Sequence, residues 1–463
     1  MASTKDELKA KFVGKTLHHV PTPSAVLDLA KVEVNCDRML QAIERLDLGW
    51  RPHIKTHKTI ELTRLQVGDA SSSLASIVVS TILEAENIVP LLQEYQHRGR
   101  KVNVLFSFPL FPSAIARLST ISTQLGAGGL SLMIDHPDQI PHVEEIHAKT
   151  GFAPLVFMKV DMGYRRAGVV PGTKECEALV DHLLASEGDG KCVLHGIYAH
   201  AGHSYETRED WKALDHLAAE FKALEEVAEM VVSKRPGHAL TLSVGASPTA
   251  TSLQHPDVDG KTSTSPHGSV SSVNNFLRDL KTQGYKLEVH AGVYPTLDLQ
   301  QLATHARDQS LLSASSIGIT ILAEVASLYA GRGPNGTTEA LINAGCLALG
   351  REPCADLGAE KGQHYAGWGI VAPWGLRNPA PGEGFPAEHG GWQVGKVSQE
   401  HGVLRWRSEA EEEIPLKVGQ RLRIWPNHAC IAGAGFNEYF VVDSRVEGKE
   451  DEIVDVWPRW NGW

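Results

Sequence analysis

Residues 52–58, Pro-His-Ile-Lys-Thr-His-Lys, are the stretch that decides the fold and the chemistry predicted for this chain. The short segment that starts at Trp50 ends at Lys55, as a strand of a parallel barrel ends at a catalytic mouth. A lysine that forms Schiff bases must spend time as the neutral amine, which is rare at the ordinary pKa of about 10.4. The sequence therefore predicts Lys55 as a reactive amine among groups that shift its pKa. The alternative is a basic surface loop whose charged side chains are solvated.

Short apolar runs recur through the first two thirds of the chain, and each is followed by a longer segment with helical spacing. This alternation predicts parallel βα units. Nine candidate strands are present where a closed (β/α)8 barrel needs eight, so we expect the first or the last to lie outside the barrel. The candidates are 24–29, the neighbours of Ile54, 77–81, 102–106, 131–135, 156–161, 194–200, 240–245 and 287–293. The segment 211–231 predicts a helix whose core-facing stripe consists of Leu214, Leu217, Phe221, Leu224 and Val227.

The last third of the chain has a different pattern, with shorter strand-like segments and most of the tryptophans. It predicts a β domain over 313–463, behind a barrel over 22–312. The expected strands are 317–327, 339–344, 392–397, 403–406, 421–425 and 439–442. Segments 254–274 and 378–391 are rich in turn-forming residues and are predicted to be surface loops.

Composition indicates a soluble enzyme of two or three domains: 463 residues, 42% hydrophobic, 21% charged, net charge -11 and pI near 6.1. The acidic balance argues against nucleic-acid and anionic-membrane partners, which need clustered positive charge. No apolar run of about 18 residues could span a bilayer, and the charged first residues are unlike a secretory signal. Six scattered cysteines favour a reducing compartment, so we expect a cytoplasmic protein.

Four motifs in order carry a family resemblance: 52–55, 161–168 (Asp-Met-Gly-Tyr-Arg-Arg-Ala-Gly), 198–203 (Tyr-Ala-His-Ala-Gly-His) and 426–430 (Pro-Asn-His-Ala-Cys). From about residue 21 to 443 the chain resembles the D-serine dehydratase and D-threonine aldolase family of fold-type III pyridoxal-phosphate enzymes. The resemblance implies an alanine racemase-like (β/α)8 barrel plus a C-terminal β domain that residues 1–21 join. It also implies that Lys55 carries pyridoxal 5'-phosphate covalently and that the enzyme is a homodimer.

Two glycine-containing strand ends are candidates for holding the cofactor phosphate, because glycine permits the close backbone approach that such contacts need. They are 244–249 and 290–294, and as isolated motifs they are equally typical of tight turns. With the resemblance, Ser247, Thr249, Gly292 and Tyr294 are assigned to the phosphate.

Other candidate contacts follow two further predicted strands. Arg166 is expected near the phenolic oxygen of the cofactor or the substrate carboxylate, since a guanidinium suits either partner. Tyr198, His200 and Tyr205 are expected near the cofactor ring or the substrate. An ordinary surface ion pair, or a buried hydrogen-bonded side chain, would have the same sequence pattern.

His428 and Cys430 stand two residues apart in a segment predicted to be extended, which would place them on one face. Imidazole and thiolate together favour a borderline-soft ion such as zinc, although a chance pair is the commoner explanation of this spacing. The resemblance implies a metal with these two protein ligands. Aldolase members typically have aspartate at the second position, so cysteine there implies the zinc-dependent dehydratases.

The function expected from the resemblance is β-elimination of D-serine to pyruvate and ammonia, with pyridoxal phosphate and Zn²⁺ as cofactors. Lys55 would take the Cα proton, and zinc would act as a Lewis acid at the β-hydroxyl. Three alternatives stay open: retro-aldol cleavage of D-threonine, dehydration of a D-3-hydroxyaspartate, and a non-catalytic pyridoxal-phosphate carrier. The β domain and the His428/Cys430 pair argue against the carrier.

Overall fold

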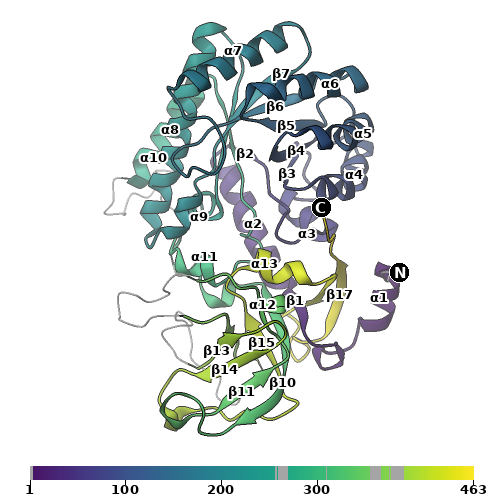
Figure 1. Ribbon diagram of the computed structural model, residues 1–463, viewed down its shortest axis with the longest axis vertical. Helices are drawn as coiled ribbons and strands as arrows, with labels where there is room; N and C mark the ends of the chain where they lie inside the picture. The colour runs from purple at the N-terminus through teal and green to yellow at the C-terminus, as the bar shows by residue number, and fades with distance from the viewer. Residues whose placement is uncertain are drawn as a thin grey trace. The chain divides into compact units, whose positions relative to one another are not determined.

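The computed structural model describes residues 4–255, 258, 269–308, 310–354, 366–374, 376 and 391–463, and it divides into two compact units (Figure 1). The barrel unit comprises residues 37–292 and 462–463, and the β unit comprises residues up to Cys36 together with 293–461. The sequence predicted the boundaries at 22 and 312. The barrel unit is shorter at both ends than this prediction, because residues 24–28 form a strand of the β unit and residues from Val293 onward also pack in that unit.

The barrel unit contains an eight-stranded parallel sheet in the order β2-β9-β8-β7-β6-β5-β4-β3. A parallel bridge between His53 and Val78 joins its two ends, with Ile54 N donating to Val78 O at 3.1 Å and Val78 N donating to Pro52 O at 2.9 Å. The predicted eight-stranded parallel barrel is therefore confirmed. Its strands are β2 (Gly49–Trp50), β3 (Ala75–Val79), β4 (Val102–Pro109), β5 (Leu130–Ile134), β6 (Leu155–Lys159), β7 (Val193–Tyr198), β8 (Thr241–Val244) and β9 (Lys286–Val289).

Helices lie outside these strands in Figure 1, as in a (β/α)8 barrel. Several begin at a threonine N-cap, for example Thr81, whose hydroxyl accepts from the backbone of Glu84. The five predicted stripe residues of α8 are all fully buried, which confirms that helix. The helices are α2 (Leu29–Arg45), which crosses the boundary between the units, α3 (Ile60–Val67), α4 (Ile82–His97), α5 (Ile115–Leu125), α6 (Ile140–Thr150), α7 (Lys174–Gly188), α8 (Asp210–Lys234), α9 (Ser247–Ser252) and α10 (Ser269–Thr282).

The β unit contains a nine-stranded sheet in the order β11-β14-β13-β12-β15-β10-β1-β16-β17, and β11 also pairs with β10. All its pairs are antiparallel except β1 with β16. The strands are β1 (Ser24–Asp28), β10 (Ile319–Tyr329), β11 (Glu339–Ile342), β12 (Ile370–Val371), β13 (Trp392–Val397), β14 (Gly402–Trp406), β15 (Arg421–Trp425), β16 (Glu438–Val442) and β17 (Ile453–Pro458). Four short helices accompany them: α1 (Lys5–Phe12), α11 (Leu299–Ala303), α12 (Cys346–Leu349) and α13 (Ala429–Ala432).

The N-terminal residues belong to the β unit, as the resemblance implied. Leu8 and Phe12 of α1 are buried in one core cluster with Phe440 and Val456. The first of the nine candidate strands, 24–29, is therefore the one outside the barrel, since β1 pairs with β10 and β16.

The two predicted surface loops are tested only at their edges. Residues 269–274 are helical and open α10, contrary to the prediction, while 256–257, 259–268 and 378–390 lie outside the described residues. No disulfide joins the six cysteines, all of which the structure describes. Among the described helices, none combines the length and the apolar character needed to cross a bilayer.

Candidate cofactor and metal sites

Lys55 follows the bridge that closes the barrel, and its side chain is half-buried at the carboxyl ends of the strands. Gly292, after β9, lies beside it: a Cβ added there would be 3.7 Å from Lys55 Cε and 3.4 Å from His53 Cβ. His53 N donates to Ala291 O at 2.8 Å, which fixes the two segments against each other. The structure thus brings together two of the predicted cofactor residues, and the glycine keeps space open next to the amine.

The stretch around Lys55 is buried rather than solvated, which excludes the surface-loop alternative. His53 Nε2 hydrogen-bonds Ser80 Oγ at 3.0 Å, and His57 is fully buried. Lys58 Nζ lies 3.0 Å from the carboxylate of Glu84, with side-chain exposures of 12% and 0%. An ion pair this deeply buried anchors the loop after Lys55, since breaking it would leave an uncompensated charge.

The mouth of the barrel keeps its histidines neutral. Burial lowers the pKa of His53, and the charge of Lys55 adds to that effect. Burial likewise lowers the pKa values of His200 and His290 well below the usual range, with the charge of Lys159 contributing to both. Lys159, the last residue of β6, has its pKa lowered to about 7, mainly by burial and then by the charge of Arg166. Cations therefore surround these imidazoles, a setting that favours an anionic ligand.

His290 has a nitrogen that fits a polar ligand. Its ring stacks on Tyr198, with centroids 4.0 Å apart and an interplanar angle of 8°. Its Nδ1 lies 3.2 Å from the hydroxyl of Ser243, which donates to Glu288 at 2.8 Å. Its Nε2 is buried and has no hydrogen-bond partner among the described residues. Such an orphaned atom at the mouth of the barrel fits a cofactor with a polar aromatic ring such as pyridoxal phosphate.

Ser247 and Thr249 lie at the start of α9, directly after β8, and both are buried. The Thr249 hydroxyl donates to Glu220 of α8 at 2.9 Å and accepts from Ala246 N at 2.9 Å. Gly245, just before α9, has φ +144°, and a Cβ there would lie 2.1 Å from His290 O. Only glycine fits that position, so the turn predicted to bind phosphate has its shape imposed by close backbone packing.

Arg166 and Tyr205 lie on the loops after β6 and β7. Arg166 is exposed, with its guanidinium 5.3 Å from the ring centroid of Tyr164. Tyr164 in turn lies against Gly202, where a Cβ would be 2.3 Å from the ring. Tyr205 is half-buried in the η4 segment (Gly202–Glu206). The motifs at 161–168 and 198–203 therefore meet, although the contact of Arg166 with a cofactor or substrate oxygen stays a prediction.

His428 and Cys430, the predicted metal ligands, lie in the β unit, as does Tyr294, which is buried there. The sequence predicted that this segment is extended throughout, but the structure differs. His428 is extended (φ -136°, ψ 108°) but caps α13, in which Cys430 is helical. The ring and the thiol are nevertheless hydrogen-bonded. Asp298, the N-cap of α11, accepts from Ala429 N at 2.8 Å and so holds the segment between the two predicted ligands.

The surroundings of His428 are negative. Burial lowers its pKa, but the hydrogen bond and charge of Cys430 and the charges of Asp298 and Glu352 outweigh burial and raise the pKa to about 9. Its Nδ1 is buried without a hydrogen-bond partner in the described part of the chain. No group of three or more histidine, cysteine or acidic side chains is placed to hold a metal among the described residues. A buried nitrogen beside a thiol fits a thiophilic divalent cation with two protein ligands.

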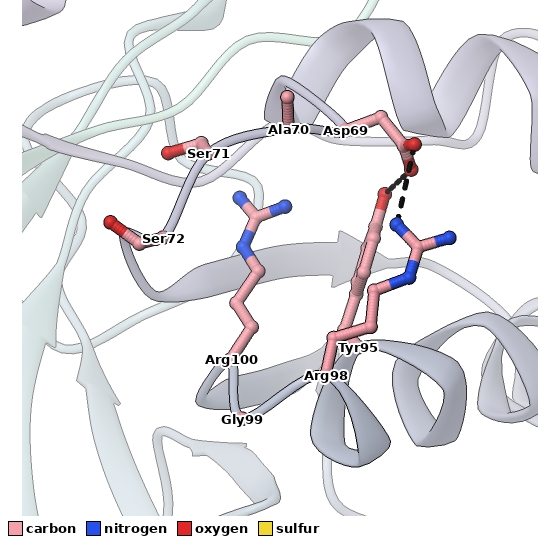
Figure 2. A pocket seen from close by; sticks show the side chains of 8 residues that line it. All are labelled: Asp69, Ala70, Ser71, Ser72, Tyr95, Arg98, Gly99 and Arg100. Carbon is pink, nitrogen blue, oxygen red and sulfur yellow. Dashed lines mark hydrogen bonds and ion pairs between the residues drawn. The ribbon is translucent and has the colours of Figure 1, made fainter.

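A pocket of about 230 Å³ in the barrel unit lies elsewhere, at the amino ends of β3 and β4 (Figure 2). Its charged groups all have partners within the protein. Asp69 accepts from Tyr95 at 2.8 Å and pairs with Arg98 at 3.4 Å. Arg100 donates to three backbone carbonyls. The pocket is therefore explained by structural pairing, and catalytic groups of a barrel belong at the other end.

Sequence reasoning missed four residues of these sites: Lys159, Glu220, His290 and Asp298. For Glu220 a signal existed, because a carboxylate three residues after Leu217 and four before Leu224 falls on the apolar face of α8. Lys159 lies two residues before the motif at 161–168, at the end of a barrel strand, and the carboxyl ends of the strands form the catalytic mouth. His290 and Asp298 had no comparable signal, since their importance comes from neighbours distant in sequence.

Sequence profiles of two families match the chain, "Alanine racemase, N-terminal domain" over residues 27–260 and "Putative serine dehydratase domain" over 318–442. Together with the closed barrel and its mouth lysine, they define the class as the alanine racemase-like, fold-type III pyridoxal-phosphate enzymes. D-serine dehydratases of Schizosaccharomyces pombe and Saccharomyces cerevisiae are 35% and 32% identical over 99% of this chain, and the alignments cover 96% and 100% of those proteins. The chain belongs to the D-serine dehydratase family.

Solved structures agree with this placement. The structure of D-threo-3-hydroxyaspartate dehydratase from Delftia sp. HT23 is 26% identical, covers 97% of this chain and 100% of that chain, and has a TM-score of 0.71. Two further structures of that enzyme, with TM-scores of 0.70 and 0.72, are substituted variants. One has a cysteine replaced by alanine and is metal-free, and the other has alanine in place of a histidine two residues earlier.

Proposed function

We propose that this protein is a D-serine dehydratase that converts D-serine to pyruvate and ammonia. The observation that carries the proposal is the placement of Lys55 at the closing seam of the barrel, beside Gly292, in a chain at least 32% identical to two D-serine dehydratases. The elimination removes the Cα proton and the β-hydroxyl as water. The enamine product then tautomerises and takes up water to release ammonia, which balances the reaction.

Lys55 has two roles in this reaction. Its amine would hold the cofactor covalently, and the same amine, when free, is the base that would accept the Cα proton. Pyridoxal phosphate, when bound, supplies an electron sink for the charge left at Cα. The residues assigned to cofactor contacts besides Lys55 are Arg166, Tyr198, Tyr205, Ser247, Thr249, Gly292 and Tyr294.

His428 and Cys430 are proposed to hold Zn²⁺. Hydroxide is a poor leaving group, and the ion, when bound, supplies Lewis-acid stabilisation of negative charge on the departing oxygen. The negative surroundings that raise the pKa of His428 support a cation there. The metal-free cysteine variant of the Delftia enzyme also supports it, because histidine and cysteine two residues apart match the spacing in this chain.

The metal pair is tested by Cys430→Ala and the matched control Cys346→Ala, a second partly exposed cysteine in the same unit. We expect Cys430→Ala to lower pyruvate release from D-serine at least about 100-fold and to lose bound zinc, because one of two protein ligands is gone. The control should behave like the unmodified protein. Undiminished turnover by Cys430→Ala after metal stripping would remove zinc from the mechanism.

A substrate panel separates the alternatives. D-serine should give pyruvate, L-serine nothing, and D-threonine no glycine. D-threo-3-hydroxyaspartate, the substrate in the name of the Delftia relative, would give oxaloacetate. Binding of its second carboxylate requires an additional cationic group in the site. Faster turnover of that compound than of D-serine would overturn the substrate assignment, and bound cofactor without any turnover would favour the carrier.

We further propose that the working form is a homodimer in the cytoplasm. The family resemblance supports the dimer, and six cysteines without a disulfide support a reducing compartment. Light scattering on the purified protein measures the mass directly, and a monomeric mass at working concentration would contradict the dimer.

A further inference from the structure

Glu220 is a fully buried carboxylate in the barrel unit that the proposed reaction does not use. Its Oε1 accepts from Ala201 N at 2.7 Å and from Gly245 N at 3.2 Å, and its Oε2 accepts from the Thr249 hydroxyl at 2.9 Å. One side chain of α8 therefore joins the loop after β7 to the loop after β8 and to the start of α9. These are the segments that carry several of the proposed cofactor contacts.

The hydrogen bonds of Glu220 continue to His200. The N–H of Gly245 donates to Glu220, while the carbonyl of the same residue, which belongs to the next peptide unit, accepts from His200 Nδ1 at 2.7 Å. A carbonyl oxygen has no proton to donate, so the proton between them belongs to Nδ1 of His200. Because burial keeps the pKa of His200 low, its Nε2 is then an unprotonated acceptor. Glu220 thus holds Gly245, the residue whose carbonyl fixes the tautomer of His200.

Stability alone does not account for Glu220. It lies between Leu217 and Leu224 on the apolar face of α8, where a buried carboxylate is costly. Replacing buried charged groups by apolar ones of similar size is often neutral or stabilising. A carboxylate at this place needs another role, and its three partners all belong to the mouth of the barrel.

We propose that Glu220 is a positioning residue for the cofactor, and that it acts by holding the loops after β7 and β8 so that His200 presents a neutral ring with Nε2 as acceptor. This inference rests on the proposed function, because the ligand it addresses is pyridoxal phosphate. Glu220 itself contacts loop backbone and Thr249. Its effect on the cofactor is transmitted through Gly245 and His200.

The test is a double-mutant cycle between Glu220 and His200, measured as the Kd for pyridoxal phosphate of the apoprotein titrated in a spectrophotometer. Glu220→Ala should weaken cofactor binding about tenfold, because three hydrogen bonds that hold the loops of the mouth are lost. In a His200→Phe background the same change should cost less than about threefold, since the residue it orients is gone. Glu220→Gln, which keeps an acceptor oxygen for the two backbone N–H groups, should restore most of the affinity.

Glu84→Ala is the matched control. Glu84 is also fully buried and also accepts from a backbone N–H, that of Ser80 at 2.8 Å. Its ion pair with Lys58 anchors the loop after Lys55, so Glu84→Ala is expected to weaken cofactor binding by a route that does not include His200. Its effect on cofactor affinity should be the same with and without His200→Phe. If Glu220→Ala does not fold, Glu220→Asp, one methylene shorter, takes its place in the cycle.

Additive losses for Glu220 and His200, or an unchanged Kd in Glu220→Ala, would overturn the inference. A merely structural role would also give additivity, together with lower thermal stability that Gln does not rescue. Failure of the proposed function has a different signature. An intact cycle without pyruvate from D-serine rejects the substrate and leaves the role of Glu220 standing, whereas a wild-type protein that binds no pyridoxal phosphate rejects both.

Discussion

The histidines of the two units differ in the direction of their pKa shifts. At the mouth of the barrel, burial and nearby cations lower the pKa values of His53, His200 and His290. In the β unit, His428 is partly buried, yet its pKa is raised to about 9 because a thiol and two carboxylates outweigh the effect of burial. The electrostatic surroundings of the histidines are therefore positive at the mouth of the barrel, which suits an anionic cofactor, and negative around His428, which suits a cation.

The largest expected effect is at the amine of the barrel site. Lys55→Ala should abolish borohydride-stable attachment of pyridoxal phosphate and lower pyruvate formation at least about 1,000-fold, since both nucleophile and base are lost. Peptide mapping after reduction measures the attachment in the unmodified protein. A label on Lys159, the other lysine of the mouth, would break the assignment.

A smaller effect is expected from the charge on Lys159. The pKa of Lys159 in the folded protein is about 7, below the ordinary value of about 10.4. As pH falls from about 10.4 to about 7, Lys159 therefore becomes protonated in the unfolded chain but stays neutral in the folded protein. Stability from this group is present above that window and is lost as pH falls through it. Between pH 9.5 and 7.5 the loss is roughly 2–3 kcal/mol in the free energy of unfolding.

Lys159→Met should remove that pH dependence, because methionine does not titrate. Urea unfolding at the two pH values measures it, and Lys149→Met, at an exposed lysine of α6, should retain the dependence of the unmodified protein. An unchanged slope in Lys159→Met would mean that burial does not lower the pKa of Lys159 in the folded protein.

The smallest expected effect tests the negative surroundings of His428 in the β unit. Glu352→Gln removes one of the negative charges near His428, at a partly exposed position where such an interaction is worth up to about 1 kcal/mol. Zinc affinity should fall by about two- to fivefold, as measured by competition with a chromophoric chelator. Glu411→Gln, at an exposed glutamate in the same unit, should leave it unchanged. A tenfold gain in affinity would contradict the negative field.

Much of the fold could be predicted because strands buried on both faces appear as continuous apolar runs. That rule found β3 to β9, but the strand expected from Trp50 to Lys55 is only the partly exposed pair Gly49–Trp50 followed by a bridge at His53. The rule also could not assign residues 24–28 to a sheet, since five buried residues look alike in either unit. The two-residue strand β12 and the strand β17, which carries Asp455, have too weak a pattern to be seen. Helix α13 was missed because four residues at a cap carry no periodicity.

The candidate sites were predictable where a motif was local. Lys55 and Gly292 were placed near each other from separate motifs, and the structure brings them together. His290 and Glu220 depend on partners in other elements, such as Ser243 and Gly245, and no spacing in one sequence reveals such pairs.

The seam at His53 and Val78 has a consequence for assembly of the enzyme. The two ends of the barrel sheet, next to β2 and in β3, meet at this bridge, and Lys55 follows two residues after His53. Before the barrel closes, the side chain of Lys55 has no defined position. Acquisition of the yellow chromophore should therefore mark the last stage of maturation, and unfinished molecules would remain colourless.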